Sequence, residues 1–288
     1  MKTSRYIVPP GKNIRLNEFD TSDTGPFKEK EEAAEKLEKD IRRLAALQDI
    51  LYAQDRYALL IIIQAMDAAG KDSVVKHVMS GINPQGCQVY SFKAPSAEEL
   101  DHDFLWRCLQ RVPERGRIGI FNRSYYEEVL VVRVRPDLLE KEHLPPEAQG
   151  RDIWKNRYDD INNVEQYLVR NGIHILKFFL HVSREEQKKR FLARIDEPDK
   201  NWKFSLDDLA TRAAWGKYMD AYEAMLNHTS TSWAPWHVIP ADHKWFTRAL
   251  VADCIVAKLE SLDLRYPPVL ERHRVELRRA RRMLQQEK

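Results

Sequence analysis

Residues 57–73 read YALLIIIQAMDAAGKDS, a short apolar run that leads directly into a loop with a Gly-Lys pair. The first seven of these residues are continuous and rich in β-branched side chains, which is typical of a strand buried on both faces of a parallel sheet. A helical pattern over 74–79 follows the loop. Strand, loop and helix in this order predict an α/β fold with a ligand site at the loop.

The loop resembles in spacing a phosphate-binding loop, G-x-x-x-x-G-K-[ST], counted from Ala65. Ala65 stands in place of the first glycine, and Asp72 in place of the hydroxyl residue. Backbone N–H groups at a helix N-terminus bind phosphate oxygens, and Lys71 supplies a positive charge to the transferred phosphoryl group. The expected phosphate-binding residues here are Ala68, Ala69, Gly70, Lys71 and Ser73. The alternative is an ordinary strand-to-helix turn.

Two carboxylates, Asp67 and Asp72, lie within this loop. Carboxylates repel phosphates unless a divalent cation bridges them, so the pattern predicts Mg²⁺ held by Asp67 and Asp72 directly or through water. Asp72 can alternatively orient the acceptor, or serve as an N-terminal helix partner.

A second polar cluster follows the apolar run at 118–121 and reads NRSYYEE, residues 122–128. An amide such as that of Asn122 is a weak ligand, so a metal ion here would depend more on Asp67, Glu127 or water. Arg123 can stabilise charge on a transferring phosphoryl group, although an arginine at a strand end is also often a surface ion-pair partner.

A basic helix after the apolar segment 173–182 carries Arg190 and Arg194 on one face, and Lys203 follows in the next loop. In nucleotide-kinase-like folds, a lid at this place lays arginines over the phosphates and excludes water. The alternative is a solvated basic face. We place the lid at about 183–210.

The remaining pattern alternates strands and helices, which predicts a mostly parallel five-stranded sheet with helices on both faces. The other expected strands are 87–92 and 236–240, and Ser96 begins a helix that buries Leu100, Phe104, Cys108 and Val112. We divide the chain into an irregular arm (1–26), one large domain (27–265) and a basic tail (266–288).

Composition narrows the class of protein further. The net charge of the 288 residues is only +3, and the last 18 residues hold seven Lys/Arg against three Glu. No apolar run approaches the ~20 residues that span a bilayer, and the N-terminus does not resemble a secretory signal, so we expect a cytoplasmic protein. We expect neither nucleic acid nor a membrane as a partner. Three separated cysteines predict no disulfide framework.

Four motifs together resemble the second family of polyphosphate kinases: DAAGKD (67–72), NRSYY (122–126), QKKRFLAR (187–194) and WKFS (202–205). The likeness extends over 30–265. It implies a thymidylate-kinase-like P-loop fold and Mg²⁺-dependent, reversible phosphoryl transfer between inorganic polyphosphate and a nucleotide. The family's functional residues match Asp67, Gly70, Lys71, Asp72, Arg123, Arg190 and Arg194.

One departure from the family pattern concerns the substrate. Many members have DRSWYNR where this chain has NRSYYEE, and this variant resembles the subgroup that phosphorylates both nucleotides, AMP to ADP and ADP to ATP. Asn122, Arg123 and Tyr126 are then expected at the nucleotide, and Glu127 near the metal or the acceptor phosphate. The polyphosphate chain needs a track of cations, for which the candidates are Lys76, Arg115, Arg117, Arg133, Arg135 and Lys203.

The resemblance also implies a homo-oligomer, a dimer or a tetramer. Two other readings stay open: an ATP-dependent nucleotide or nucleoside kinase, which would share the loop and the lid, and a non-catalytic polyanion-binding protein that uses the basic tail.

Overall fold

Five parallel strands form the centre of the molecule, in the order β2-β3-β1-β4-β5. The computed structural model describes residues 1–287. The strands are β1 (Ala58–Ala65), β2 (Cys87–Ser91), β3 (Ile118–Asn122), β4 (Ile173–His181) and β5 (Trp236–Pro240). Every residue of β1 is buried, as its continuous apolar run predicts. The predicted α/β sheet is confirmed, with strand ends within two residues of those expected.

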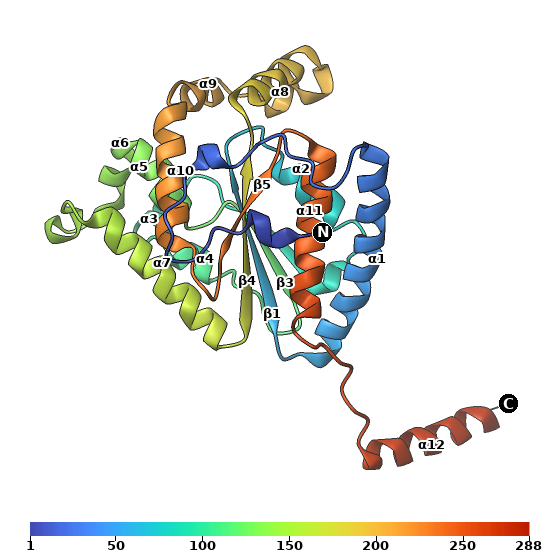
Figure 1. Ribbon diagram of the computed structural model, residues 1–288. Helices are drawn as coiled ribbons and strands as arrows, with labels where there is room; N and C mark the ends of the chain where they lie inside the picture. Colours follow the sequence, from blue (N-terminus) through green and yellow to red (C-terminus); the bar gives the residue numbers. More distant parts are fainter. Residues whose placement is uncertain (288) are drawn as a thin grey trace.

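Helices cover both faces of the sheet (Figure 1). One face carries α1 (Lys30–Gln54), α2 (Lys71–Val78) and α11 (Lys244–Glu260), and α11 packs against both of the others. The other face carries α5 (Glu127–Val134), α7 (Ile153–Arg170) and α10 (Trp215–Thr229). The core therefore lies in two layers, and the carboxyl ends of the strands remain open for a ligand.

The lid segment lies at the carboxyl edge of the sheet, at the top of Figure 1. It consists of α8 (Arg184–Asp196), the 3-10 helix η6 (Pro198–Lys203) and α9 (Leu206–Ala213). Ser183 precedes α8 as its N-cap, and its Oγ accepts a hydrogen bond from the Glu186 backbone N–H at 3.0 Å. The remaining short 3-10 helices are η1 (Thr3–Tyr6), η2 (Leu16–Glu18), η3 (Pro84–Gly86), η4 (Glu140–Glu142) and η5 (Pro146–Gln149).

The helix expected from Ser96 is not continuous. The structure has two single-turn helices, α3 (Ala97–Leu100) and α4 (Trp106–Leu109), and α6 (Pro136–Leu139) is another short helix after α5. The capping box at Ser96 is present. Asp103 interrupts the helix because its carboxylate accepts a hydrogen bond from the Leu105 backbone N–H at 2.9 Å, a local turn that competes with helix formation.

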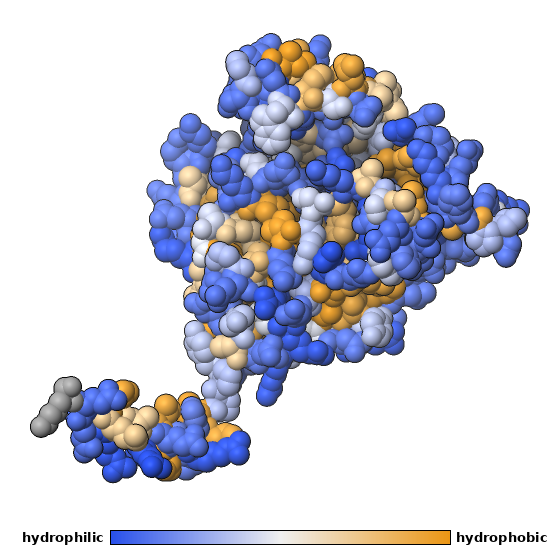
Figure 2. All heavy atoms as spheres, turned by 180° about the vertical axis from the view of Figure 1, so that it is seen from behind, coloured by the Kyte–Doolittle hydropathy of each residue, from blue (hydrophilic) through white to orange (hydrophobic). Residues whose placement is uncertain are grey.

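The two ends of the chain differ in how they pack. The N-terminal arm is irregular but buries Tyr6, Val8 and Leu16, and the Val8 N–H donates to the Trp236 carbonyl at 2.9 Å. In contrast, α12 (Glu271–Gln286) has no buried residue and lies apart from the body, with apolar and charged side chains both exposed (Figures 1 and 2). Over residues 1–287, no helix is long and apolar enough to cross a membrane.

Candidate active site

A polar cleft of about 510 Å³ opens at the carboxyl ends of β1 and β3, below the lid. Within residues 1–287, its wall contains two carboxylates, Asp67 and Asp72, and an excess of positive charge. The eight cationic residues are Lys71, Lys93, Arg123, Arg190, Arg194, Lys200, Lys203 and Lys244. A cleft lined by charges of one sign concentrates ligands of the opposite sign, here a polyanion.

The loop between β1 and α2 forms the floor of the cleft. Ala68 has φ 62° and Gly70 has φ 113°, so the backbone is left-handed at both positions. At Gly70 the requirement for glycine is conformational, because an added Cβ would meet nothing closer than Arg190 Nη1 at 3.9 Å. The turn brings the start of α2 to the cleft, where first-turn N–H groups lack partners within the helix and can bind phosphate oxygens.

Lys71 is the first residue of α2. Its Nζ donates to the Ala65 carbonyl at 2.8 Å and lies 3.4 Å from the Met66 carbonyl. Burial lowers the pKa of this ammonium below its usual value, and Arg123 adds to that effect, while Asp67, Glu127 and Asp72 oppose it. Lys71 is therefore a poorly hydrated cation whose charge a bound phosphate would stabilise.

Each acidic residue of the loop is matched to a residue at the end of β3. Arg123 Nη2 lies 2.9 Å from Asp67 Oδ1, and Asn122 Nδ2 donates to Asp72 Oδ1 at 2.7 Å. Arg123 has φ 66°, a conformation that costs a non-glycine residue about 1–2 kcal/mol. The strained backbone places the guanidinium beside the loop, as expected for strain stored at a functional site.

A metal site made by protein groups alone is not present in the described residues. Among residues 1–287, no three His, Cys, Asp or Glu side chains come together as a metal-binding group. The carboxylates of Asp67 and Asp72 do line one cleft. Mg²⁺ is commonly held by one or two carboxylates with substrate phosphates and water completing its shell, so this donor set fits such an ion.

The lid arginines have different roles from one another. Arg190 is 7% exposed, and its guanidinium donates to four backbone carbonyls, those of Ala68, Ala69, Ala241 and Asp242. It lines the cleft and clamps the phosphate loop at the same time. Arg194 is freer, since its Nη1 lies 3.5 Å from Asp208 Oδ2, and Lys203 also lines the cleft.

Two predicted site residues, Tyr126 and Glu127, do not reach the cleft wall. Tyr126 has 0% exposure and its hydroxyl donates to Glu165 at 2.8 Å, which corrects the expectation that it contacts the nucleotide. With the Gln64 amide oriented to satisfy its neighbours, Gln64 donates to Glu127 Oε1 at 2.8 Å. Glu127 is therefore not grouped with Asp67 and Asp72 as a third ligand; burial raises its pKa.

Most of the predicted cation track also lies elsewhere. Arg133 donates to the Tyr158 hydroxyl at 2.7 Å, and Arg117 donates to the Gln85 carbonyl near the amino end of β3. Neither they nor Lys76, Arg115 and Arg135 line the cleft, so Lys203 is the member of that group in place. Arg115 and Arg117 precede the strand expected from residue 118, so the rule that ligands bind at the carboxyl ends of parallel strands could have excluded them.

Three cations near the cleft were missed from the sequence. Lys93 follows β2 and Lys244 begins α11, and both line the cleft. Arg248, one turn further along α11, donates to Ser73 Oγ at 2.7 Å. Lys244 and Arg248 lie four residues apart just after β5. The rule that ligands bind at the carboxyl ends of parallel strands could therefore have identified them from the sequence.

The fold and the cleft define a P-loop kinase-like protein: a parallel sheet, a Gly-Lys loop at a helix start and a cationic lid. The family model for polyphosphate kinase 2 matches residues 27–267, and the chain belongs to that family. It is 53% identical over 285 residues to the ADP-polyphosphate phosphotransferase of Rhodopseudomonas palustris, covering 99% of each chain.

Two further relatives extend the comparison. The AMP/ADP-polyphosphate phosphotransferase of Meiothermus ruber is 44% identical over 264 residues, which is 91% of this chain and 95% of that protein. The crystal structure of polyphosphate kinase 2 from Arthrobacter aurescens is 38% identical and superposes with a TM-score of 0.87, covering 96% of both chains. The predicted family and fold are confirmed.

Proposed function

We propose that this protein transfers the terminal phosphoryl group of inorganic polyphosphate to ADP and to AMP. The observation that carries the proposal is the cleft itself, in which a P-loop lysine and Arg123 share a wall with lid cations. Membership of the polyphosphate kinase 2 family supports the choice of donor.

The transfer needs little chemistry from the protein. A terminal phosphate oxygen of the nucleotide attacks the last phosphorus of the polyphosphate, and the bridging P–O bond to the next unit breaks. The shortened polyphosphate leaves with the electron pair of that bond, so no covalent enzyme intermediate is required. Lys71 and Arg123 neutralise charge on the moving group, as positioning and electrostatic stabilisation account for most phosphoryl-transfer catalysis.

Polyphosphate carries a charge on every unit and therefore needs several cations beyond the reacting phosphate. Lys200 and Lys203 from η6 and Lys244 from α11 line the same cleft as Lys71. We assign the polyphosphate chain to this side, under the lid, with the nucleotide phosphate beside Asp67 and Arg123. Closure of the cationic lid would exclude water, so that the nucleotide and not a water molecule receives the phosphoryl group.

We further propose that the reaction requires Mg²⁺, held by Asp67 and Asp72 together with substrate phosphates. A divalent cation there supplies charge neutralisation between the two carboxylates and the phosphates. Asn122, which donates to Asp72 Oδ1 at 2.7 Å, fixes the orientation of one carboxylate. Chelation with EDTA should abolish transfer, and added Mg²⁺ should restore it.

The choice of acceptor rests on the loop after β3 and on the relatives. The Rhodopseudomonas relative is named for ADP and the Meiothermus relative for AMP and ADP. The motif NRSYYEE resembles that of the dual-acceptor subgroup and supports the same choice, and its Asn122 lines the cleft. We propose that ADP and AMP are both accepted.

The test is chromatography of the nucleotides formed from long-chain polyphosphate, Mg²⁺ and either AMP or ADP. We expect ATP from ADP, and ADP followed by ATP from AMP. Product from ADP alone would contradict the assignment of two acceptors, but it would still support polyphosphate as the phosphoryl donor. Transfer from ATP to a nucleoside or AMP, with no use of polyphosphate, would identify an ATP-dependent kinase instead.

A further inference from the structure

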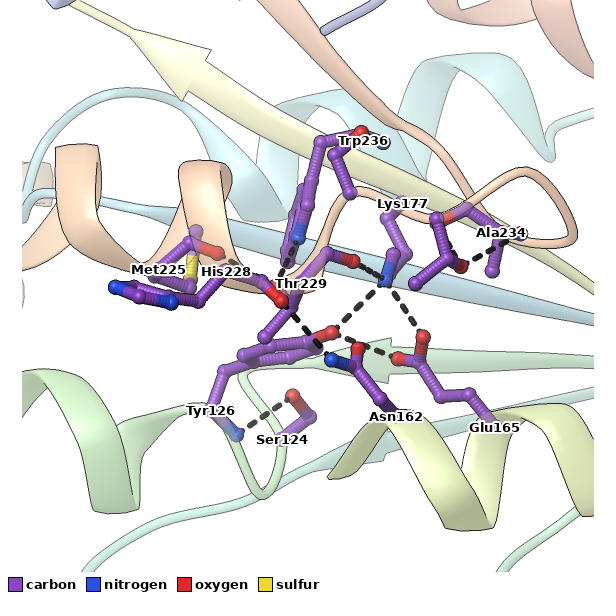
Figure 3. Close-up of polar contacts among 12 residues, drawn as sticks. Ser124, Tyr126, Asn162, Glu165, Lys177, Met225, His228, Thr229, Ala234 and Trp236 are labelled. Atoms are coloured by element: carbon purple, nitrogen blue, oxygen red, sulfur yellow. Dashed lines mark hydrogen bonds and ion pairs between the residues drawn. The ribbon is translucent and has the colours of Figure 1, made fainter. Parts of the chain in front are cut away.

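A buried ion pair lies directly behind the loop that carries Arg123. Lys177 of β4 and Glu165 of α7 are both 0% exposed, and Lys177 Nζ lies 2.6 Å from Glu165 Oε2. Lys177 also donates to the Tyr126 hydroxyl at 2.9 Å and to the Thr229 carbonyl at 2.7 Å, so its three N–H groups are all used (Figure 3).

The other carboxylate oxygen of Glu165 holds two consecutive tyrosines. Tyr125 and Tyr126 donate their hydroxyl protons to Glu165 Oε1 at 3.0 and 2.8 Å. Burial, with the nearby Glu165 charge, raises the pKa of both hydroxyls well above the usual value, so both remain donors. The Tyr126 ring also meets Trp236 edge to face, with ring centroids 4.8 Å apart.

These tyrosines directly follow Arg123 and Ser124 in the chain. Ser124 is 0% exposed, and its Oγ accepts from the Tyr126 backbone N–H at 3.2 Å. The backbone of Arg123 has a left-handed conformation, and its N–H donates a hydrogen bond to the Ile63 carbonyl at 3.1 Å. A strained loop conformation persists only where surrounding contacts hold it in place. The hydrogen-bonded side chains of Tyr125 and Tyr126 supply such contacts on the C-terminal side of Arg123.

Stability alone is a weak reason for such a pair. Removing two charges from water generally costs as much as their attraction returns, and apolar replacements are often neutral or stabilising. A fully satisfied buried network does, however, fix one geometry. The network here is satisfied at Lys177 and at both oxygens of Glu165.

We propose that Glu165 and Lys177 are positioning residues for phosphoryl transfer: they anchor Tyr125 and Tyr126 and thereby hold the Arg123 guanidinium at the cleft. The inference rests on the proposed function. The residues touch no substrate, and they act through the loop that leads from β3 into α5.

Two double variants isolate the anchoring contact. Glu165→Leu with Lys177→Met removes both charges and the acceptor of the tyrosine hydroxyls. Glu165→Gln with Lys177→Met also removes both charges but keeps an amide oxygen that can accept from the tyrosines. Neither variant leaves one buried charge unpaired, the change that most often unfolds a protein.

We expect the leucine variant to lower kcat/KM for ADP by about 100-fold, the scale for a misplaced catalytic group. Most of this loss should fall on kcat, because Arg123 neutralises charge on the moving group, and a smaller part on KM, because Arg123 also lies beside the nucleotide phosphate. The glutamine variant should recover most of that loss. In an Arg123→Ala background, the leucine variant should cause no further loss, because the group it positions is absent. Near-ultraviolet circular dichroism would verify that each variant is folded.

An equal loss from the leucine variant with and without Arg123, or unchanged kcat in the leucine variant, would overturn the inference. If the leucine variant does not fold, Tyr125→Phe with Tyr126→Phe gives the same test with the ion pair intact. Turnover by the unsubstituted protein distinguishes failure of the proposed function from failure of this inference. No turnover would contradict the proposed function. Turnover that the variants at Glu165 and Lys177 leave unchanged would contradict only the positioning role.

Discussion

The backbone conformation of Gly70 explains why the phosphate loop requires glycine at this position. Its φ of 113° is unfavourable for a side chain although an added Cβ would have space. Gly70→Ala should therefore destabilise the protein by about 1–2 kcal/mol and weaken polyphosphate binding. Gly216 is the matched control: it lies in α10 without a positive φ and with nothing near its Cβ position.

Gly216→Ala should be neutral or stabilising by up to about 1 kcal/mol, because alanine favours helix. Urea unfolding of the two variants gives the comparison. Equal effects at positions 70 and 216 would argue against strain as the reason for glycine in the loop.

His237 predicts a pH dependence of stability. Burial lowers its pKa from 6.5 to about 4. Between these values the unfolded chain binds more protons than the folded one, so stability falls as pH falls through that window, by up to about 3 kcal/mol from this residue. His237→Gln should reduce the loss measured between pH 7 and pH 4.5. A variant with the same pH profile as the parent would show that His237 does not contribute.

Helix α8 holds the phosphate loop in place through Arg190, which donates hydrogen bonds to the carbonyls of Ala68 and Ala69. Arg190→Met would leave buried carbonyls without donors and cost about 2–4 kcal/mol. We expect faster hydrogen exchange at residues 66–71 and a lower kcat. Protection equal to that of the parent would mean that the loop keeps its conformation without α8.

The last helix should make no contribution to folding stability. Because α12 has no buried residue, Leu277→Gln with Leu284→Gln should change the free energy of unfolding by less than about 0.5 kcal/mol. Thermal unfolding at one protein concentration is sufficient to measure it. A clear loss of stability would show that this helix packs against the body or against another copy.

Elements with strong periodic signals could be predicted from the sequence. The buried run at 57–63 correctly predicted the first strand, and Ser96 correctly predicted the start of a helix. The break at Asp103 could not be predicted, because a side-chain hydrogen bond there overrides the helical spacing. The burial of the Tyr126 side chain could not be predicted either, because its hydrogen-bond partner Glu165 lies 39 residues away in the chain.

The sequence predicted the family, the sheet and the loop residues that meet at the cleft. It did not predict that Lys93 and Lys244 share that cleft. Both follow strands, but the order of the strands in the sheet, which decides which strand ends adjoin β1, is set by pairing between distant chain segments. The assembly of the chain into a dimer or tetramer stays a prediction. Exposed Trp202 and Leu206 on the lid, 78% and 77% accessible, are surfaces that such an assembly could cover.

The central claim is that the cleft around Lys71 transfers a phosphoryl group from polyphosphate to a nucleotide. The most direct measurement is the initial rate of ATP formation from long-chain polyphosphate, Mg²⁺ and ADP. The parent protein and the Lys71→Ala variant are compared at a temperature at which thermal unfolding shows both to be folded. We predict robust formation by the parent and a loss of at least about 100-fold in the variant. Comparable rates from both proteins would contradict the assignment of this cleft as the active site.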